Sequence, residues 1–397
     1  MPAIPHIKKK IGNAYLIWFQ NTNSFVQLEE TAWYVFRKTI QRYRPATLAK
    51  NFAIRYDISP ENSLSYVNEI LSEIEKLNHI IPAKNETGHI PDKLKGYQFK
   101  PYSIHHYRFG NKVVPFVFET RNFEYYIHPL ISHLEVESTV TEIPLFELFA
   151  FNGRIVFRQG GEIKGMWSYD ETQFVKGKIF MQLINVMHNK TDAEWLMTVH
   201  ASAITNQKKT ILFSAPPGHG KTTMAALLQS RGYHLISDDF VPIDRNSFSA
   251  WPFPIAMSVK EGSMELLASI YPALEQKSLN YLSPEKSVRY FTSDPDFDSS
   301  KAVFPVREFV FIEYNTSVDF EWEKLDTATA IKLLLDQAWI VPMPDNAGIL
   351  LEQIPRISFF KLTYSDNEKA IKAITDLFEH ESLMNDGSQI RINKIHE

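Results

Sequence analysis

The stretch that decides how the rest of the chain is interpreted reads Ala215-Pro216-Pro217-Gly218-His219-Gly220-Lys221-Thr222. It lies between a short apolar run at 210–214, which predicts a strand, and residues 222–230, whose composition favours a helix. A small residue, four variable positions and then Gly-Lys-Thr form a pattern typical of loops that bind nucleotide phosphates. The alternative is a tight Pro/Gly turn that carries an exposed lysine.

The residue types of this loop suit phosphate chemistry. Gly218 and Gly220 let backbone N–H groups turn toward phosphate oxygens, and the following helix points its N-terminus at the anion. Lys221, expected on a surface loop, supplies a positive charge near the terminal phosphates, and the Thr222 hydroxyl can ligate Mg²⁺. The predicted nucleotide-binding residues are Ala215, Pro216, Pro217, Gly218, His219, Gly220, Lys221, Thr222 and Thr223.

Two adjacent carboxylates, Asp238 and Asp239, follow the apolar run at 234–237. Their position at a strand end can bring them to the mouth of the loop, where one carboxylate could hold a metal ion. The other could accept a proton from an incoming hydroxyl. The alternative is a solvated turn at the end of a strand. His200 lies one predicted strand upstream of the loop, and on pattern alone it favours a structural histidine over a catalyst.

Composition excludes several classes of protein. The 397 residues are 44% hydrophobic and 22% charged, unlike a disordered or fibrous chain. The net charge of −4 provides no basic field for nucleic acid, and the lack of cysteine excludes disulfides, iron–sulfur clusters and thiol nucleophiles. Apolar runs are too short for a membrane span, and no secretory signal is visible. We therefore expect a soluble, cytoplasmic protein without nucleic-acid or membrane partners.

The first block, to about residue 81, predicts a winged-helix-like module. Two strand-like runs, at 15–19 and 24–28, are separated by turn-prone residues. Three helical patterns follow, at about 31–40, at 46–55 and from Pro60 onward.

Beyond a polar linker at 82–94 the pattern becomes strand-rich and shows no catalytic constellation. From Thr191 it changes to strand, glycine-rich turn, helix and strand, which predicts a βαβ-like unit. We expect an N-terminal module at 1–85, a connecting subdomain at 86–190, a catalytic domain at 191–383 and a polar tail at 384–397. Strands are predicted at 116–119, 124–127, 154–157, 233–237 and 309–314, and helices at 171–188 and 367–378.

Three segments in this order resemble the catalytic domain of HPr kinase/phosphorylase: residues 198–201 with the histidine, the loop at 215–222, and residues 231–239 (RGYHLISDD). Residues 304–307 (FPVR) resemble the family's P-V-R element. The resemblance covers about residues 191–378. It implies an α/β phosphate-loop fold similar to HPr kinase and phosphoenolpyruvate carboxykinase, and an ATP- and Mg²⁺-dependent serine kinase.

The resemblance also implies roles for individual residues. Asp238 would be the general base, Asp239 and Thr222 would serve the metal, and Lys221 the phosphates. His200 and Arg307 would assist around the transferring group. Arg307 has an alternative as the partner of a nearby carboxylate.

The chain departs from the family between Asp239 and Arg307, where true HPr kinases carry a Gly/Arg-rich segment for their protein substrate. HPr is therefore not the expected substrate, and the sequence is similar to the divergent HPr-kinase-related proteins found beside peptide-modification enzymes. In this stretch Lys260 could contact the phosphate or the substrate, or be a solvated loop lysine.

The N-terminal block resembles PqqD-like domains, through residues 26–32 and 58–61. Such modules recognise the leader of a ribosomally made peptide, and the edge of the ribbon could accept an extended peptide strand beside the third helix. The alternatives are a DNA-binding winged helix and a purely structural domain.

The leading hypothesis is a kinase for a Ser or Thr hydroxyl of a peptide or protein, with a precursor peptide as the expected acceptor and ATP and Mg²⁺ as cofactors. The alternatives are a kinase of a small hydroxylated metabolite and a nucleotide-binding scaffold without catalysis. A homo-oligomer is left open.

Overall fold

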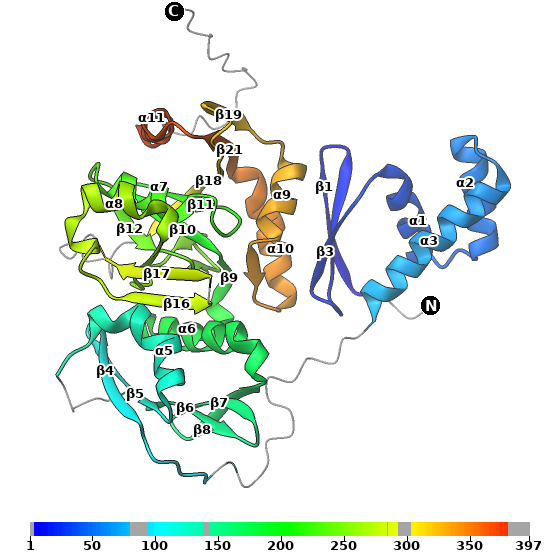
Figure 1. Cartoon of the computed structure of the whole chain (residues 1–397). Helices are drawn as coiled ribbons and strands as arrows, with labels where there is room; N and C mark the ends of the chain where they lie inside the picture. The colour runs from blue at the N-terminus through cyan, green and yellow to red at the C-terminus, as the bar shows by residue number, and fades with distance from the viewer. Residues whose placement is uncertain are drawn as a thin grey trace, which may run out of the picture.

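The computed structural model describes residues 4–79, 94, 96–137, 143–283, 285–292 and 303–379. Within them the chain is mixed α/β, with an N-terminal module, a middle region and a larger C-terminal region (Figure 1). The predicted linker, apart from Leu94, and the predicted polar tail lie outside the described residues.

The N-terminal module is a three-stranded antiparallel sheet followed by three helices. Its elements are β1 (His6–Ile11), β2 (Ala14–Phe19), β3 (Ser24–Leu28), α1 (Glu30–Ile40), α2 (Pro45–Tyr56) and α3 (Pro60–Asn78). The predicted strands and helices are confirmed, but the ribbon has an additional edge strand, β1. Three consecutive lysines obscure the apolar pattern of β1, and such lysines are common on edge strands. One face of the sheet packs on the helices through Ile17, Phe19, Trp33 and Phe36.

The other face of this sheet packs on two helices of the C-terminal region, α9 (Thr327–Leu335) and α10 (Pro344–Gln353). Leu16 of β2 shares a hydrophobic cluster with Leu350 of α10. The Asn23 side chain donates a hydrogen bond to the Ile340 carbonyl at 3.3 Å. The module is therefore docked against the C-terminal region, as Figure 1 shows for β1 beside α9 and α10.

The middle region is a five-stranded sheet covered by two helices. Its elements are β4 (Ser103–Phe109), β5 (Lys112–Phe118), α5 (Arg121–Ile131), β6 (Phe146–Phe151), β7 (Arg154–Gln159), β8 (Glu162–Trp167) and α6 (Thr172–His188). The strands predicted at 116–119 and 154–157 and the helix at 171–188 are confirmed. The strand predicted at 124–127 is wrong, because these residues belong to α5. Their β-favouring composition is overruled by the helical spacing of Phe123, Ile127 and Leu130, which are all buried.

The C-terminal region is built on a ten-stranded sheet in the order β12-β10-β11-β18-β14-β13-β9-β20, in which β21 also pairs with β18 and β19 pairs with β21. The strands predicted at 210–214, 233–237 and 309–314 are confirmed, and so are the helices predicted at 222–230 and 367–378. The elements nearest the predicted loop are β10 (Ala201–Thr205), β11 (Thr210–Ser214), α7 (Lys221–Gln229), β12 (His234–Ser237), β18 (Phe304–Tyr314) and β21 (Ser358–Tyr364). β10 lies antiparallel between β11 and β12, so the predicted βαβ-like unit has a strand inserted between its two parallel strands.

The remaining elements complete the sheet and its surroundings. They are β9 (Trp195–Val199), β13 (Val241–Asp244), β14 (Ser249–Ala250), β15 (Met257–Lys260), α8 (Met264–Ile270), β16 (Leu279–Ser283), β17 (Lys286–Phe291), β19 (Phe320–Lys324), β20 (Ala338–Ile340) and α11 (Asn367–Glu379). β15, β17 and β16 form a separate three-stranded sheet, which Figure 1 shows between the large sheet and α5.

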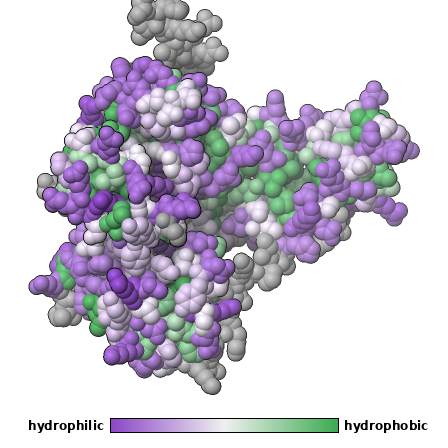
Figure 2. Space-filling view, in the orientation of Figure 1, coloured by the Kyte–Doolittle hydropathy of each residue, from purple (hydrophilic) through white to green (hydrophobic). Residues whose placement is uncertain are grey.

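The face of the molecule shown in Figure 2 is mostly hydrophilic over the middle and C-terminal regions, with apolar surface along the N-terminal module. In that module Ile54 and Leu64 are exposed. None of the helices in the described residues is both long enough and apolar enough to cross a membrane.

Candidate functional site

The loop at 215–220 joins the end of β11 to the start of α7, and its glycines are required by its backbone. Gly218 and Gly220 have φ of +96° and +92°, in the region that favours glycine. A Cβ on Gly220 would lie 3.2 Å from the Tyr364 hydroxyl and 3.3 Å from the Tyr314 Cβ, whereas Gly218 faces open space. Gly220 therefore lets the loop lie directly against the ends of β18 and β21.

The start of α7 provides backbone donors next to the loop. The first helical hydrogen bond runs from the Met224 N–H to the Gly220 carbonyl at 2.8 Å. The N–H groups of residues 221–223 belong to the first helical turn and have no acceptor within the helix. The Tyr314 N–H donates to the His219 carbonyl at 3.2 Å and fastens the loop to β18. This arrangement is suited to binding an anion.

Lys221 is held beside the acidic pair. Its ammonium group makes an ion pair with Asp239, and its Nζ lies 3.4 Å from His200 Nε2. Lys221 is the first residue of α7 and is 7% exposed, so the expectation of a surface-loop position is wrong. The buried ammonium is therefore held between Asp239 and His200.

Asp238 is the buried member of the pair, with 1% of its surface exposed. Ser202 of β10 donates a hydrogen bond to one carboxylate oxygen, and Thr222 of α7 donates to the other at 3.1 Å. Burial, together with the neighbouring Asp239 charge, raises the pKa of Asp238 to about 6. Both oxygens are thus already engaged by side-chain hydroxyls.

Asp239 is the accessible member, with its side chain 38% exposed. Its φ is +65°, a left-handed conformation that turns the chain sharply at the end of β12. Burial would raise its pKa, but the Lys221 ammonium lowers the pKa of Asp239 below its ordinary value. The two carboxylates therefore differ in exposure and in the direction of their pKa shift, although they are adjacent in the sequence.

His200 lies at the rim of the same mouth, between β9 and β10. Its backbone N–H donates to the Gln337 carbonyl at 2.8 Å, and its Nδ1 lies 3.2 Å from the Asp239 carbonyl. Partial burial and the nearby Lys221 charge lower the pKa of His200. The imidazole is therefore neutral at pH 7, so one ring nitrogen can donate a hydrogen bond and the other can accept one.

Arg307 is not brought to the loop. β11 and β18 are parallel, with Thr210 opposite Val306 and Ser214 opposite Phe311. Arg307 consequently lies near the start of β18, about 13 Å of strand before the residue that faces the start of the loop. Lys260, at the end of β15, lies close enough to the site for its charge to lower the pKa of both Asp239 and His200.

Three residues that the sequence did not single out also belong to the site. The Ser202 hydroxyl donates a hydrogen bond to Asp238, but in the sequence nothing distinguishes Ser202 from any other serine of a buried strand. Burial lowers the pKa of Lys176 of α6, and the nearby Asp239 carboxylate opposes this shift. Tyr290 of β17, whose pKa burial raises to about 12, is also influenced by Asp239. The middle region therefore supplies part of the wall, and no motif in the sequence marks it.

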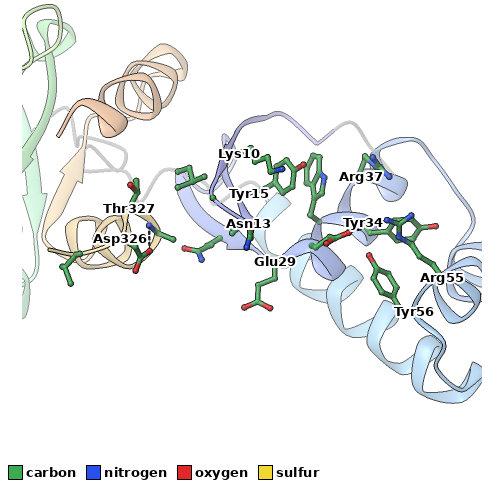
Figure 3. A pocket seen from close by; sticks show the side chains of 18 residues that line it. Lys10, Asn13, Tyr15, Glu29, Tyr34, Arg37, Arg55, Tyr56, Asp326 and Thr327 are labelled. Atoms are coloured by element: carbon green, nitrogen blue, oxygen red, sulfur yellow. Dashed lines mark hydrogen bonds and ion pairs between the residues drawn. The ribbon is translucent and has the colours of Figure 1, made fainter. Parts of the chain in front are cut away.

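A separate recess of about 1080 Å³ lies where the N-terminal module meets α9 (Figure 3). The β1–β2 turn, α1, the end of α2 and the start of α9 line it. In this recess the Arg55 guanidinium lies 5.1 Å from the centre of the Tyr34 ring and 5.5 Å from that of Tyr56. The recess thus offers aromatic and charged groups together.

The structure brings Lys221, Thr222, Asp238, Asp239 and His200 to one mouth, and leaves Arg307 outside it. Their chemistry is that of an anion site bordered by two carboxylates of different exposure. No protein-family model matches the chain, and no curated protein matches its sequence.

Proposed function

We propose that the chain is an ATP- and Mg²⁺-dependent kinase that phosphorylates a Ser or Thr hydroxyl of a peptide or protein, on a phosphate-loop fold similar to that of HPr kinase and phosphoenolpyruvate carboxykinase. The observation that carries the proposal is the Lys221–Asp239 ion pair at the glycine-rich loop, together with the hydrogen bond that Thr222 donates to the buried Asp238. Positioning and charge neutralisation are the main contributions that a protein makes to phosphoryl transfer.

The residues present fit ATP with Mg²⁺. At Gly220 a side chain would be crowded by Tyr364 and Tyr314, and the N–H groups at the start of α7 are suited to phosphate oxygens. Hydroxyl and carboxylate oxygens, such as those of Thr222 and Asp238, are the ligands that Mg²⁺ prefers. When bound, ATP would supply the phosphoryl group and Mg²⁺ would neutralise its charge.

The geometry favours exchanging the roles that the resemblance gives to the two aspartates. Asp238 is almost completely buried and shares a hydrogen bond with Thr222, so we assign these two residues to holding the metal. Asp239 is accessible and ionised, and it can accept the proton of an acceptor hydroxyl. The raised pKa of Asp238 alone would suit a base, but a base must first reach the proton that it removes.

Lys221 and His200 then assist the transfer. In the structure the Lys221 ammonium neutralises Asp239, and phosphates in the loop would compete for the same charge. His200, neutral and next to both groups, positions Asp239 through the contact between its Nδ1 and the Asp239 carbonyl.

The N-terminal module is assigned to the peptide acceptor, and the recess in Figure 3 supports this part of the proposal. Arg55→Ala should raise the KM for the peptide and leave the KM for ATP unchanged, because Arg55 lines the recess and not the loop. Lys50→Ala, an exposed change on the same helix, is the matched control. Equal peptide KM values for both variants would contradict the assignment.

The decisive experiment follows transfer of labelled phosphate from ATP to a library of Ser- and Thr-containing peptides across a Mg²⁺ titration. Asp239→Asn should reduce the transfer rate about 10²–10⁴-fold with little change in Mg²⁺ requirement. Asp238→Asn should raise the Mg²⁺ concentration needed for activity. Asp376→Asn, which removes an exposed carboxylate of α11, is the control.

Three outcomes would contradict the proposal in different ways. Wild-type transfer by Asp239→Asn would refute its assignment as the base. Binding of ATP without transfer to any acceptor would favour a scaffold. Transfer to small hydroxylated compounds in place of peptides would favour a metabolite kinase.

A further inference from the structure

Two histidines and two glutamates converge in the middle region, on elements outside the site described above. His105 lies on β4, Glu124 and His128 lie one turn apart on α5, and Glu135 follows that helix. His105 Nδ1 lies 2.5 Å from a Glu135 oxygen, and its Nε2 lies 2.6 Å from a Glu124 oxygen. Residues four apart in a helix share one face, so α5 presents both of its side chains to β4.

The second histidine is oriented by a buried tyrosine. The hydroxyl of Tyr107, which is fully buried, lies 2.8 Å from His128 Nδ1. The rings of His105 and His128 are 4.6 Å apart between centres. One ligand atom each from His105, His128 and Glu135 can be chosen so that all three lie within 4.8 Å of one another.

We propose that His105, His128 and Glu135, with Glu124 beside them, bind one divalent transition-metal ion of the Zn²⁺ class. In a tetrahedral site with metal–ligand bonds of about 2.0–2.2 Å the ligand atoms lie about 3.3–3.6 Å apart, so side-chain movements of about 1–2 Å complete the site. Glu135 is 43% exposed and can make such a movement. Imidazole and carboxylate together favour Zn²⁺ over the oxygen-ligated Mg²⁺ of the proposed kinase site.

The charges and the surrounding contacts suit this occupant. His128 is held through the contact of its Nδ1 with Tyr107, which leaves Nε2 as the ring nitrogen that can bind a metal. The Tyr107 contact fixes its ring as the outer partners of metal-ligating histidines do. Two glutamates supply negative charge that a divalent cation neutralises.

A metal at this place would join α5 to β4 and to the segment after the helix. α5 also carries Tyr125, whose hydroxyl accepts a hydrogen bond from the Tyr281 N–H of β16 at 2.6 Å. β16 pairs with β17, which carries Tyr290 near Asp239. The ion would therefore stabilise the support of one wall of the kinase site without taking part in its chemistry.

The test uses the full-length, tag-free protein after treatment with a chelator, and no nucleotide is needed. Calorimetric titration with Zn²⁺ should give one saturating equivalent and raise the melting temperature, and Mg²⁺ should not compete. His128→Gln and Glu135→Gln should each weaken Zn²⁺ binding by at least about 10–100-fold, the loss seen when even an outer partner is removed. Tyr107→Phe should weaken binding by a smaller factor within that range.

His106→Gln is the matched control, because neighbouring residues of a strand point to opposite faces. It should bind Zn²⁺ as the unmodified protein does. Visible absorption of the Co²⁺-loaded protein provides a second signature, which should disappear in His128→Gln. If that variant fails to fold, Glu135→Gln, at a more exposed position, gives the answer.

The proposal is overturned if no saturable equivalent is bound, or if Glu135→Gln and His106→Gln bind Zn²⁺ equally well. Neither result bears on the proposed kinase activity, because binding is measured without ATP.

Discussion

Adding one methyl group at each of the two loop glycines should have unequal consequences. Gly218→Ala and Gly220→Ala both place an alanine at a φ above +90°. The left-handed conformation costs a non-glycine residue about 1–2 kcal/mol, so each variant should lose this much stability. At Gly220 the new Cβ would also meet the Tyr364 hydroxyl at 3.2 Å and the Tyr314 Cβ at 3.3 Å.

Overpacking of this kind costs typically about 1–3 kcal/mol in addition. The expected loss is therefore about 1–2 kcal/mol for Gly218→Ala and about 2–5 kcal/mol for Gly220→Ala. Among the described residues the buried Tyr364 hydroxyl has no hydrogen-bond partner. Tyr364→Phe should consequently be tolerated alone and should recover part of the loss when combined with Gly220→Ala.

Urea unfolding of the nucleotide-free protein measures these differences, and the four Gly220/Tyr364 combinations form a double-mutant cycle. Gly220→Ala should also weaken ATP binding more than Gly218→Ala does, since it displaces the loop from β18. Equal stability losses for the two alanine variants would refute the crowding argument. A cycle without coupling would show that Tyr364 does not limit the space at Gly220.

Three further predictions concern charge and docking. The pKa of Asp238 is raised from 3.8 to about 6, so the folded protein binds this proton more tightly than the unfolded chain does. Stability should therefore fall by up to about 3 kcal/mol as the pH rises from about 4 to 6, and Asp238→Asn should flatten this part of the urea-unfolding profile. Lys260→Ala should raise the pKa of Asp239 and shift the acidic limb of the kcat/KM profile to higher pH, whereas an unshifted limb would place Lys260 away from the base. Deleting residues 1–79 should lower the melting temperature of the remaining chain, because it uncovers Leu350 and its neighbours on α10; an unchanged value would show that docking adds no stability.

The sequence predicts best where the relevant information is local. The strand, loop and helix around Lys221 follow from apolar periodicity and glycine placement within about twenty residues, and the structure contains all three. The proximity of Asp238 and Asp239 to Thr222 could also be predicted, because both follow a strand that ends near the loop.

The misplaced and missed features depend on long-range register and packing. Arg307 matches a short motif, but its distance from the loop is set by the pairing of β18 with β11, which no sequence pattern reveals. Lys176 reaches the site because α6 packs beside it, from a segment before the loop. β-favouring residues around Glu124 form a helix because Phe123 and Ile127 must face the sheet together. Tertiary contacts decide each of these cases.

The N-terminal sheet is packed between its own helices and α10. The module therefore cannot move relative to the C-terminal region as a module on a flexible tether would. A module on a flexible linker holds its bound segment at a variable distance from the rest of the protein, whereas a docked module holds it at one fixed distance. For the proposed peptide acceptor, the fold would then set the spacing between two positions of the peptide. The number of residues between the recognised segment and the phosphorylated hydroxyl becomes a fixed property of the protein, and hydroxyls at other spacings are passed over.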